Sequence, residues 1–116
     1  MKGGLQEKII AQFADAECRK IISSVHTEPK TVMTIGSELN LPQSTVYRKV
    51  LDLKECGLLM VHNFVFRPDG KREALYLCTF AELRFKTSDN GIEVAITLSE
   101  RALQKRWLNL FFSKQG

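Results

Sequence analysis

The sequence predicts an α+β fold in which short amphipathic helices come first and β-hairpins and a closing helix follow. Apolar residues recur at helical spacing as far as Gly57, and beyond it they alternate with polar residues, which is typical of strands. Two turn signals, at residues 68–71 and 88–91, divide the alternating region into two hairpins.

Composition places the chain among ordinary globular proteins. Its 116 residues are 44% hydrophobic and 26% charged, which suits one domain with at most a small appendage. The net charge of +4 permits contact with nucleic acid without requiring it. No apolar run approaches the roughly 18–20 residues that span a bilayer. Three scattered cysteines and the absence of a signal-peptide pattern predict free thiols in the cytoplasm.

Two helical segments are expected at the N-terminus, over residues 5–13 and 16–24. Asp15 is a suitable N-cap for the second, and Pro29 ends it because proline disfavours helical conformation in the residue before it. Whether the two segments join into one bent helix stays open at this level.

The next two helices are short and separated by a tight turn, which is the form of a helix-turn-helix. Thr34 is expected to cap the first of them, and Pro42 to start the second. Val46, Val50 and Leu53 keep the spacing of a buried stripe, and Gly57 suits the helix end. The residues expected on the outer face are Ser44, Thr45, Arg48, Lys49 and Asp52.

A β-hairpin is predicted directly after this pair, with strands over residues 58–67 and 73–80 and a bulge near Asn63. Its tip carries three basic residues, Arg67, Lys71 and Arg72. Helices followed by a basic hairpin have the layout of a winged helix-turn-helix: a three-helix core with a β-hairpin wing.

The remaining residues form an added hairpin and helix. We expect residues 1–80 to be the winged helix-turn-helix domain and residues 81–116 to be an extension for dimerisation. Ser99 should cap the closing helix, whose apolar stripe either packs across the domain or pairs with its copy. The predicted interface residues are Leu103, Trp107, Leu110 and Phe111.

From Ala14 to Phe80 the chain resembles the winged helix-turn-helix transcription regulators of bacteria and archaea, in particular the ArsR-like group. The resemblance is carried by the helix that Asp15 caps, by residues 39–51, by residues 53–59 and by the wing from Val61 to Leu77. It implies a homodimer on double-stranded DNA, with the second helix of the pair in the major groove. By position it assigns base-facing roles to Gln43, Ser44, Thr45, Tyr47 and Arg48, and the residues suited to phosphate are Lys49, Arg67, Lys71 and Arg72.

Several of these features also have alternative interpretations. Tyr47 could instead cover the edge of the core and turn only its hydroxyl outward, and the basic hairpin tip could be merely solvated. A winged helix can also serve as a protein–protein interaction module within a larger assembly. Cys56 is a candidate redox switch, with a buried structural thiol as the alternative. The cysteines and histidines are too scattered to predict a metal, and no catalytic motif or cofactor loop predicts an enzyme.

Overall fold

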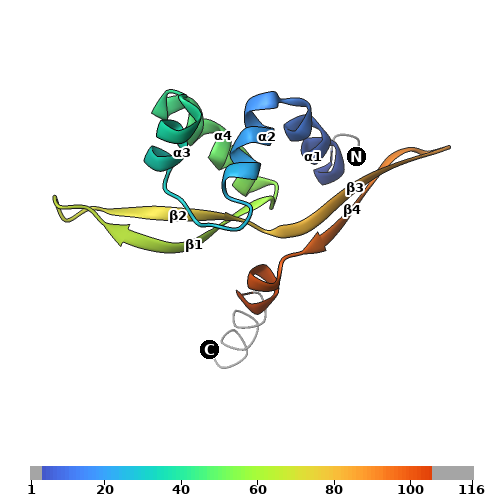
Figure 1. The fold of residues 1–116 in the computed structure, drawn as a ribbon. Coiled ribbons are helices and arrows are strands. Elements are labelled where there is room, and N and C mark those ends of the chain that lie inside the picture. Colours follow the sequence, from blue (N-terminus) through green and yellow to red (C-terminus); the bar gives the residue numbers. More distant parts are fainter. Residues whose placement is uncertain (1–3, 106–116) are drawn as a thin grey trace. The chain divides into compact units, whose positions relative to one another are not determined.

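The structure is a computed structural model that describes residues 4–105. It confirms the predicted α+β class, with helices followed by two antiparallel hairpins (Figure 1). The chain divides into two compact units, Met1–Cys78 and Thr79–Gly116.

The first two helices of the N-terminal unit are separated at Asp15. Helix α1 covers Leu5–Ala14 and helix α2 covers Ala16–Ser24, while Asp15 between them is extended, with φ −92° and ψ 119°. The Asp15 carboxylate accepts hydrogen bonds from the amides of Glu17 (2.8 Å) and Cys18 (3.1 Å). The predicted N-cap is therefore confirmed, and the chain forms two helices instead of one bent helix.

Helix α3 covers Val32–Leu39, and its start differs from the predicted one. The N-cap is Thr31, whose hydroxyl oxygen accepts from the Thr34 amide at 3.2 Å, so the prediction that Thr34 caps this helix is wrong. Two threonines three residues apart compete for this role, and Thr31 is itself nine-tenths buried. Asn40 ends α3 in the left-handed conformation, at φ 57°.

Helix α4 covers Gln43–Glu55 and provides much of the core. Pro42 occupies its N-cap, and Gly57 follows its end at φ 84°, as predicted for a residue that must be left-handed. The predicted stripe of α4 is fully buried and packs with α2, α3 and the first hairpin. The largest fully buried side chains are Ile21, Val25, Ile35, Val46, Val50, Leu53, Leu58, Leu59 and Cys78.

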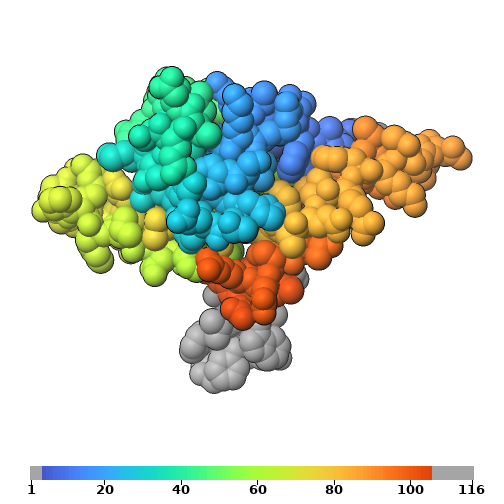
Figure 2. Space-filling view, viewed as in Figure 1, coloured from blue at the N-terminus to red at the C-terminus, as the bar shows by residue number. Residues whose placement is uncertain are grey.

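The first hairpin pairs β1 (Leu59–Phe66) with β2 (Arg72–Cys78), and its register shifts between Val61 and Asn63, where a bulge is predicted. Backbone hydrogen bonds between Lys30 and Tyr76 form an isolated antiparallel bridge beside β2. The turn end of the hairpin, yellow-green in Figure 2, projects beyond the helices of this unit. Phe66, the last residue of β1, is 77% exposed.

The C-terminal unit contains the second hairpin, β3 (Phe80–Ser88) with β4 (Gly91–Leu98). Leu83 pairs with Ile96 and Phe85 with Val94, so these four side chains share one face of the hairpin. The hydroxyl of Ser99 accepts from the amide of Ala102 at 3.1 Å, which confirms it as the cap of the helix that begins at residue 100. Within residues 4–105, no helix is long and apolar enough to cross a membrane.

Candidate functional site

The outer face of α4 presents most of the side chains that the sequence places there. Gln43, Ser44 and Arg48 are exposed, Thr45 is half-buried, and Tyr47 is 53% exposed. They lie outward because Val46, Val50 and Leu53 commit the opposite side of the helix to the core. With half of its surface open to solvent, Tyr47 turns far more than its hydroxyl outward.

Lys49 does not lie on that face, and the prediction that it does is wrong. Its side chain follows Val46 by three residues and so falls on the buried side of α4, where the residue is 8% exposed. The aliphatic stem packs inward while the ammonium reaches the N-terminus of α2. There Nζ lies 2.5 Å from Oδ2 of Asp15 and 3.6 Å from Oε1 of Glu17.

Lys49 and Asp15 each shift the pKa of the other. The hydrogen bond from Lys49 lowers the pKa of Asp15, with further help from the capping amide of Cys18. The hydrogen bond to Asp15 raises the pKa of Lys49 against the opposing effect of burial. The charge of Lys49 is thus held within the fold, where it joins α2 to α4.

The hairpin tip positions its basic residues by a tight turn. The amide of Gly70 donates to the carbonyl of Arg67 at 2.9 Å, and Gly70 itself has φ 88°. Arg67 is partly neutralised, since its guanidinium lies 3.0 Å from Oδ2 of Asp69 and 3.6 Å from Oε1 of Glu73. Lys71 is exposed, and its ammonium forms no ion pair with any residue that the structure describes.

Arg72 takes a different position, stacked on an aromatic ring. Its guanidinium carbon lies 4.1 Å from the ring centroid of Phe64 on the neighbouring strand. The two are diagonal neighbours on one face of the hairpin, because Phe64 pairs with Ala74 and Phe66 with Arg72. This contact holds a positive charge at the side of the hairpin on which Phe64 lies.

A hollow of about 440 Å³ joins the start of α4 to this face of the hairpin. Its lining residues are Val32, Met33, Gln43, Tyr47, Phe64, Arg67, Arg72, Glu73, Ala74 and Tyr76. Four residues that the sequence assigned to a DNA-binding surface therefore meet around one cavity: Gln43, Tyr47, Arg67 and Arg72. Phe64 and Met33 were not assigned to the site from the sequence, although both line this hollow. The pairing of strands in the predicted hairpin could have placed Phe64 beside Arg72.

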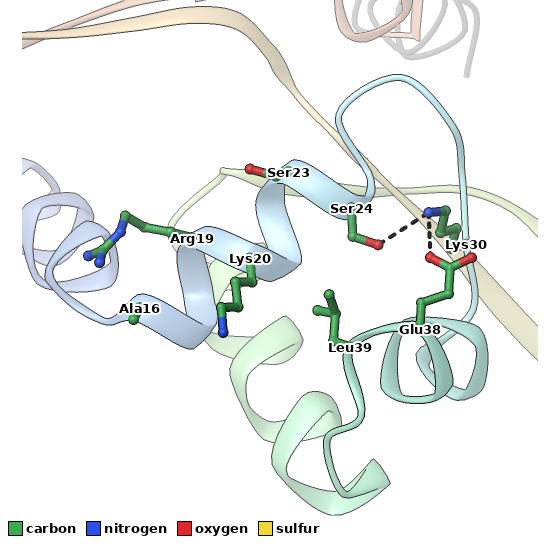
Figure 3. A pocket seen from close by; sticks show the side chains of 8 residues that line it. All are labelled: Ala16, Arg19, Lys20, Ser23, Ser24, Lys30, Glu38 and Leu39. Atoms are coloured by element: carbon green, nitrogen blue, oxygen red, sulfur yellow. Dashed lines mark hydrogen bonds and ion pairs between the residues drawn. The ribbon is translucent and has the colours of Figure 1, made fainter.

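A second hollow, of about 610 Å³, lies between α2 and α3 and contains none of the predicted site residues (Figure 3). Lys30 and Glu38 point toward one another across its edge, with Nζ 2.6 Å from Oε1, and Lys30 also contacts the hydroxyl of Ser24 at 3.3 Å. The ammonium of Lys30 is thus already compensated. Arg19 donates to the carbonyl oxygen of Phe13 at 2.6 Å, so its charge is partly engaged as well.

The three cysteines are separate and buried, and none forms a disulfide. Burial raises the pKa of Cys56 and of Cys18, which disfavours the reactive thiolate at neutral pH. Among the described residues, no group of three histidine, cysteine, aspartate or glutamate side chains is placed to hold a metal ion.

Of the residues predicted to form a dimer interface, Leu103 is 51% exposed on the helix that begins at residue 100. Trp107, Leu110 and Phe111 lie outside the described residues. The apolar face of the second hairpin also reaches solvent, where Ile96 is 39% exposed.

Compared with models of known protein families, the chain matches none. It also has no significant match among curated proteins. What the protein does is therefore inferred from its own residues and their arrangement.

Proposed function

We propose that this protein is a winged helix-turn-helix regulator of transcription that binds double-stranded DNA, with α4 in the major groove and the β1–β2 hairpin as the wing. The supporting observation is the hollow that brings Gln43 and Tyr47 of α4 together with Arg67 and Arg72 of the hairpin. A helix and a wing that converge on one concave surface can follow a duplex from a groove onto its backbone.

The chemistry of the α4 face fits the reading of bases. Gln43 can make a bidentate pair with adenine and Arg48 with guanine, while the Ser44 hydroxyl can serve a base or a phosphate. Both long side chains are exposed, and the Arg48 guanidinium forms no ion pair with a residue among 4–105. No side chain caps the start of α4, so its first amides remain available to a phosphate oxygen.

The wing supplies charge for the phosphate backbone. Lys71 and Arg72 are exposed at the tip, and Arg67 joins them with its charge shared by Asp69 and Glu73. Contacts of this kind set affinity and salt dependence but carry little sequence information. In this proposal, Lys49 has no contact with DNA, because its ammonium is bound to Asp15.

A homodimer completes the proposal. Leu103 is exposed, as are Phe85 and Ile96 on the apolar face of the second hairpin, while Leu83 on that face is half-buried. A two-stranded hairpin alone is only marginally stable in water. No charged residue lies among the paired apolar side chains of that face, so a second copy meets no like charge there. A two-fold pair would present two α4 helices to an operator that is an inverted repeat.

Selection of bound duplexes from a random pool, followed by fluorescence anisotropy, tests DNA binding. Arg48→Ala should weaken binding to the selected duplex about tenfold and relax its sequence preference, because a bidentate base contact is lost. Lys54→Ala is the matched control, since Lys54 is also exposed on α4 but close to its C-terminal end. If neither Arg48→Ala nor Gln43→Ala changes affinity or preference, the assigned face is wrong.

Sedimentation over a range of concentrations tests the dimer. The native chain should sediment at the mass of a dimer, and a variant with Leu103→Ala, Trp107→Ala and Phe111→Ala should shift toward the monomer. An unaltered mass would remove this helix from the interface.

The second candidate is a protein-interaction module, and one observation favours it. The surface near the hollow is not purely basic, since Met33 is 51% exposed, Phe66 is 77% exposed and Arg67 is paired with acids. Exposed apolar groups of this size suit a protein partner. Failure to select any duplex at low salt would favour this candidate over the regulator.

A further inference from the structure

The hollow between α4 and the wing combines features that duplex DNA alone does not need. Its lining includes the ring of Tyr47 from the helix, and the ring of Phe64 with the guanidinium of Arg72 stacked on it from the hairpin. The amide of Gln43 and the carboxylate of Glu73 add a hydrogen-bond donor and acceptors. Planar faces, a cation and polar edges therefore surround one cavity of about 440 Å³.

The side chains of Tyr47 and Phe64 are much more exposed to solvent than an aromatic side chain of the core. Tyr47 is 53% exposed and Phe64 39% exposed, whereas Tyr76, which lines the same hollow, is 7% exposed and belongs to the core. Phe66 continues the same face of β1 toward the tip, two residues beyond Phe64, and is 77% exposed. The hairpin thus carries aromatic side chains in succession along a single face, with basic residues beside them.

Flat aromatic surfaces next to arginine are the chemistry that binds a nucleobase together with its phosphate. A base within an intact duplex is stacked on both sides and cannot reach such a cavity, so the nucleotide that fits is an unpaired one. We propose that the hollow between α4 and the wing binds an unpaired nucleotide of DNA. Its base stacks against Tyr47 or the Phe64–Arg72 layer, and its phosphate contacts the arginines.

This inference rests on the proposed function, in that both place nucleic acid on the surface formed by α4 and the wing. It adds a preference: DNA with a single-stranded extension or an unpaired nucleotide should bind more tightly than blunt duplex. Stacking on an aromatic side chain is worth enough per base to change affinity about tenfold.

Anisotropy titrations of the full chain with three labelled probes test the inference: a blunt duplex, the same duplex with a short thymidine tail, and the tail strand alone. We expect the tail to tighten binding about tenfold. Phe64→Leu should abolish that gain, measured as the ratio of tailed to blunt affinity within the same variant, while Phe64→Tyr should retain the gain because it keeps the ring. Val65→Ala is the matched control, since Val65 is an equally exposed residue of the same strand, at 39%, and lies on its opposite face. Thermal unfolding confirms that each variant is folded.

The outcomes separate the two proposals. A blunt duplex that binds, with a tail that adds nothing, overturns the inference and leaves the proposed function standing. So does a gain that survives Phe64→Leu, because the tail then binds elsewhere. Binding of the single strand alone, lost in Phe64→Leu, supports the inference and contradicts the proposed function. No binding to any probe overturns both.

Discussion

The ammonium of Lys49 lies 2.5 Å from Oδ2 of Asp15, a residue 34 positions earlier in the chain. Asp15 at the same time caps α2 through its other carboxylate oxygen, which accepts from the amides of Glu17 and Cys18. Asp15 thus ends α1 through its backbone amide, caps α2 through its side chain and joins that cap to α4. Because α4 carries the proposed reading face, this contact ties that face to the start of α2.

Replacing Asp15 should destabilise the fold in two separable steps. Asp15→Ala removes the cap and leaves the ammonium of Lys49 with only the more distant Glu17, so the free energy of unfolding should fall by about 1–2 kcal/mol. Asp15→Asn keeps a capping oxygen and should cost less than Asp15→Ala. Urea unfolding at neutral pH measures both, with Asp52→Asn, an exposed acid on α4, as the control. Equal losses in the two Asp15 variants would show that the cap contributes nothing.

The same pair predicts how stability depends on pH. The pKa of Asp15 is lowered in the folded chain, so its contribution is present above the unfolded value of 3.8 and is lost as pH falls below it. The pKa of Lys49 is raised, so its contribution is present below 10.5 and is lost as pH rises beyond it. Chemical unfolding at pH values from acid to neutral should therefore show a flatter acid limb for Asp15→Asn than for the native chain. Parallel curves would contradict the shift assigned to Asp15.

Much of the fold follows from local chemistry that a sequence displays directly. Asp15 before an apolar period identifies a helix start, Gly57 identifies a helix end, and residues 68–71 identify the hairpin turn. The bulge near Asn63 is visible because the apolar spacing in β1 breaks there. Each of these features depends on the conformations open to a few neighbouring residues.

Features set by distant contacts could not be obtained in this way. Lys49 is a charged residue on a helix, and only the position of α2 shows that its ammonium has acids to reach. Phe66 continues an alternating strand pattern, but it is the last residue of β1, next to the turn, and is 77% exposed. Thr31 and Thr34 are both suitable N-cap residues, and the sequence does not show that the helix begins after Thr31. The hollow beside α4 requires the relative placement of three elements, which periodicity does not encode.

Gly36 should be intolerant of a side chain although it lies within a helix. A Cβ at this position would meet the carbonyl oxygen of Leu41 at 3.0 Å and Cγ2 of Val46 at 3.6 Å. Alanine has the better helix propensity by about 1 kcal/mol, but this close approach forms the turn between α3 and α4. Gly36→Ala should therefore lower the unfolding temperature, whereas Ser37→Ala, at an exposed neighbour, should not. A more stable Gly36→Ala protein would show that the Leu41 carbonyl can move aside without cost.

Substitutions of two charged residues at the wing tip, Lys71 and Asp69, should change the affinity for DNA in opposite directions. Lys71→Ala should weaken binding to the selected duplex and reduce the slope of log K against log salt by about 0.9, the value of one lost phosphate contact. Asp69→Asn should act in the other direction, because it releases Arg67 from its 3.0 Å ion pair for a phosphate. The asparagine also retains the oxygen that accepts from the Lys71 amide at 3.0 Å, so the turn should persist. Anisotropy titrations at several salt concentrations measure both slopes. If neither substitution alters its slope, the tip of the wing does not lie on the phosphate backbone.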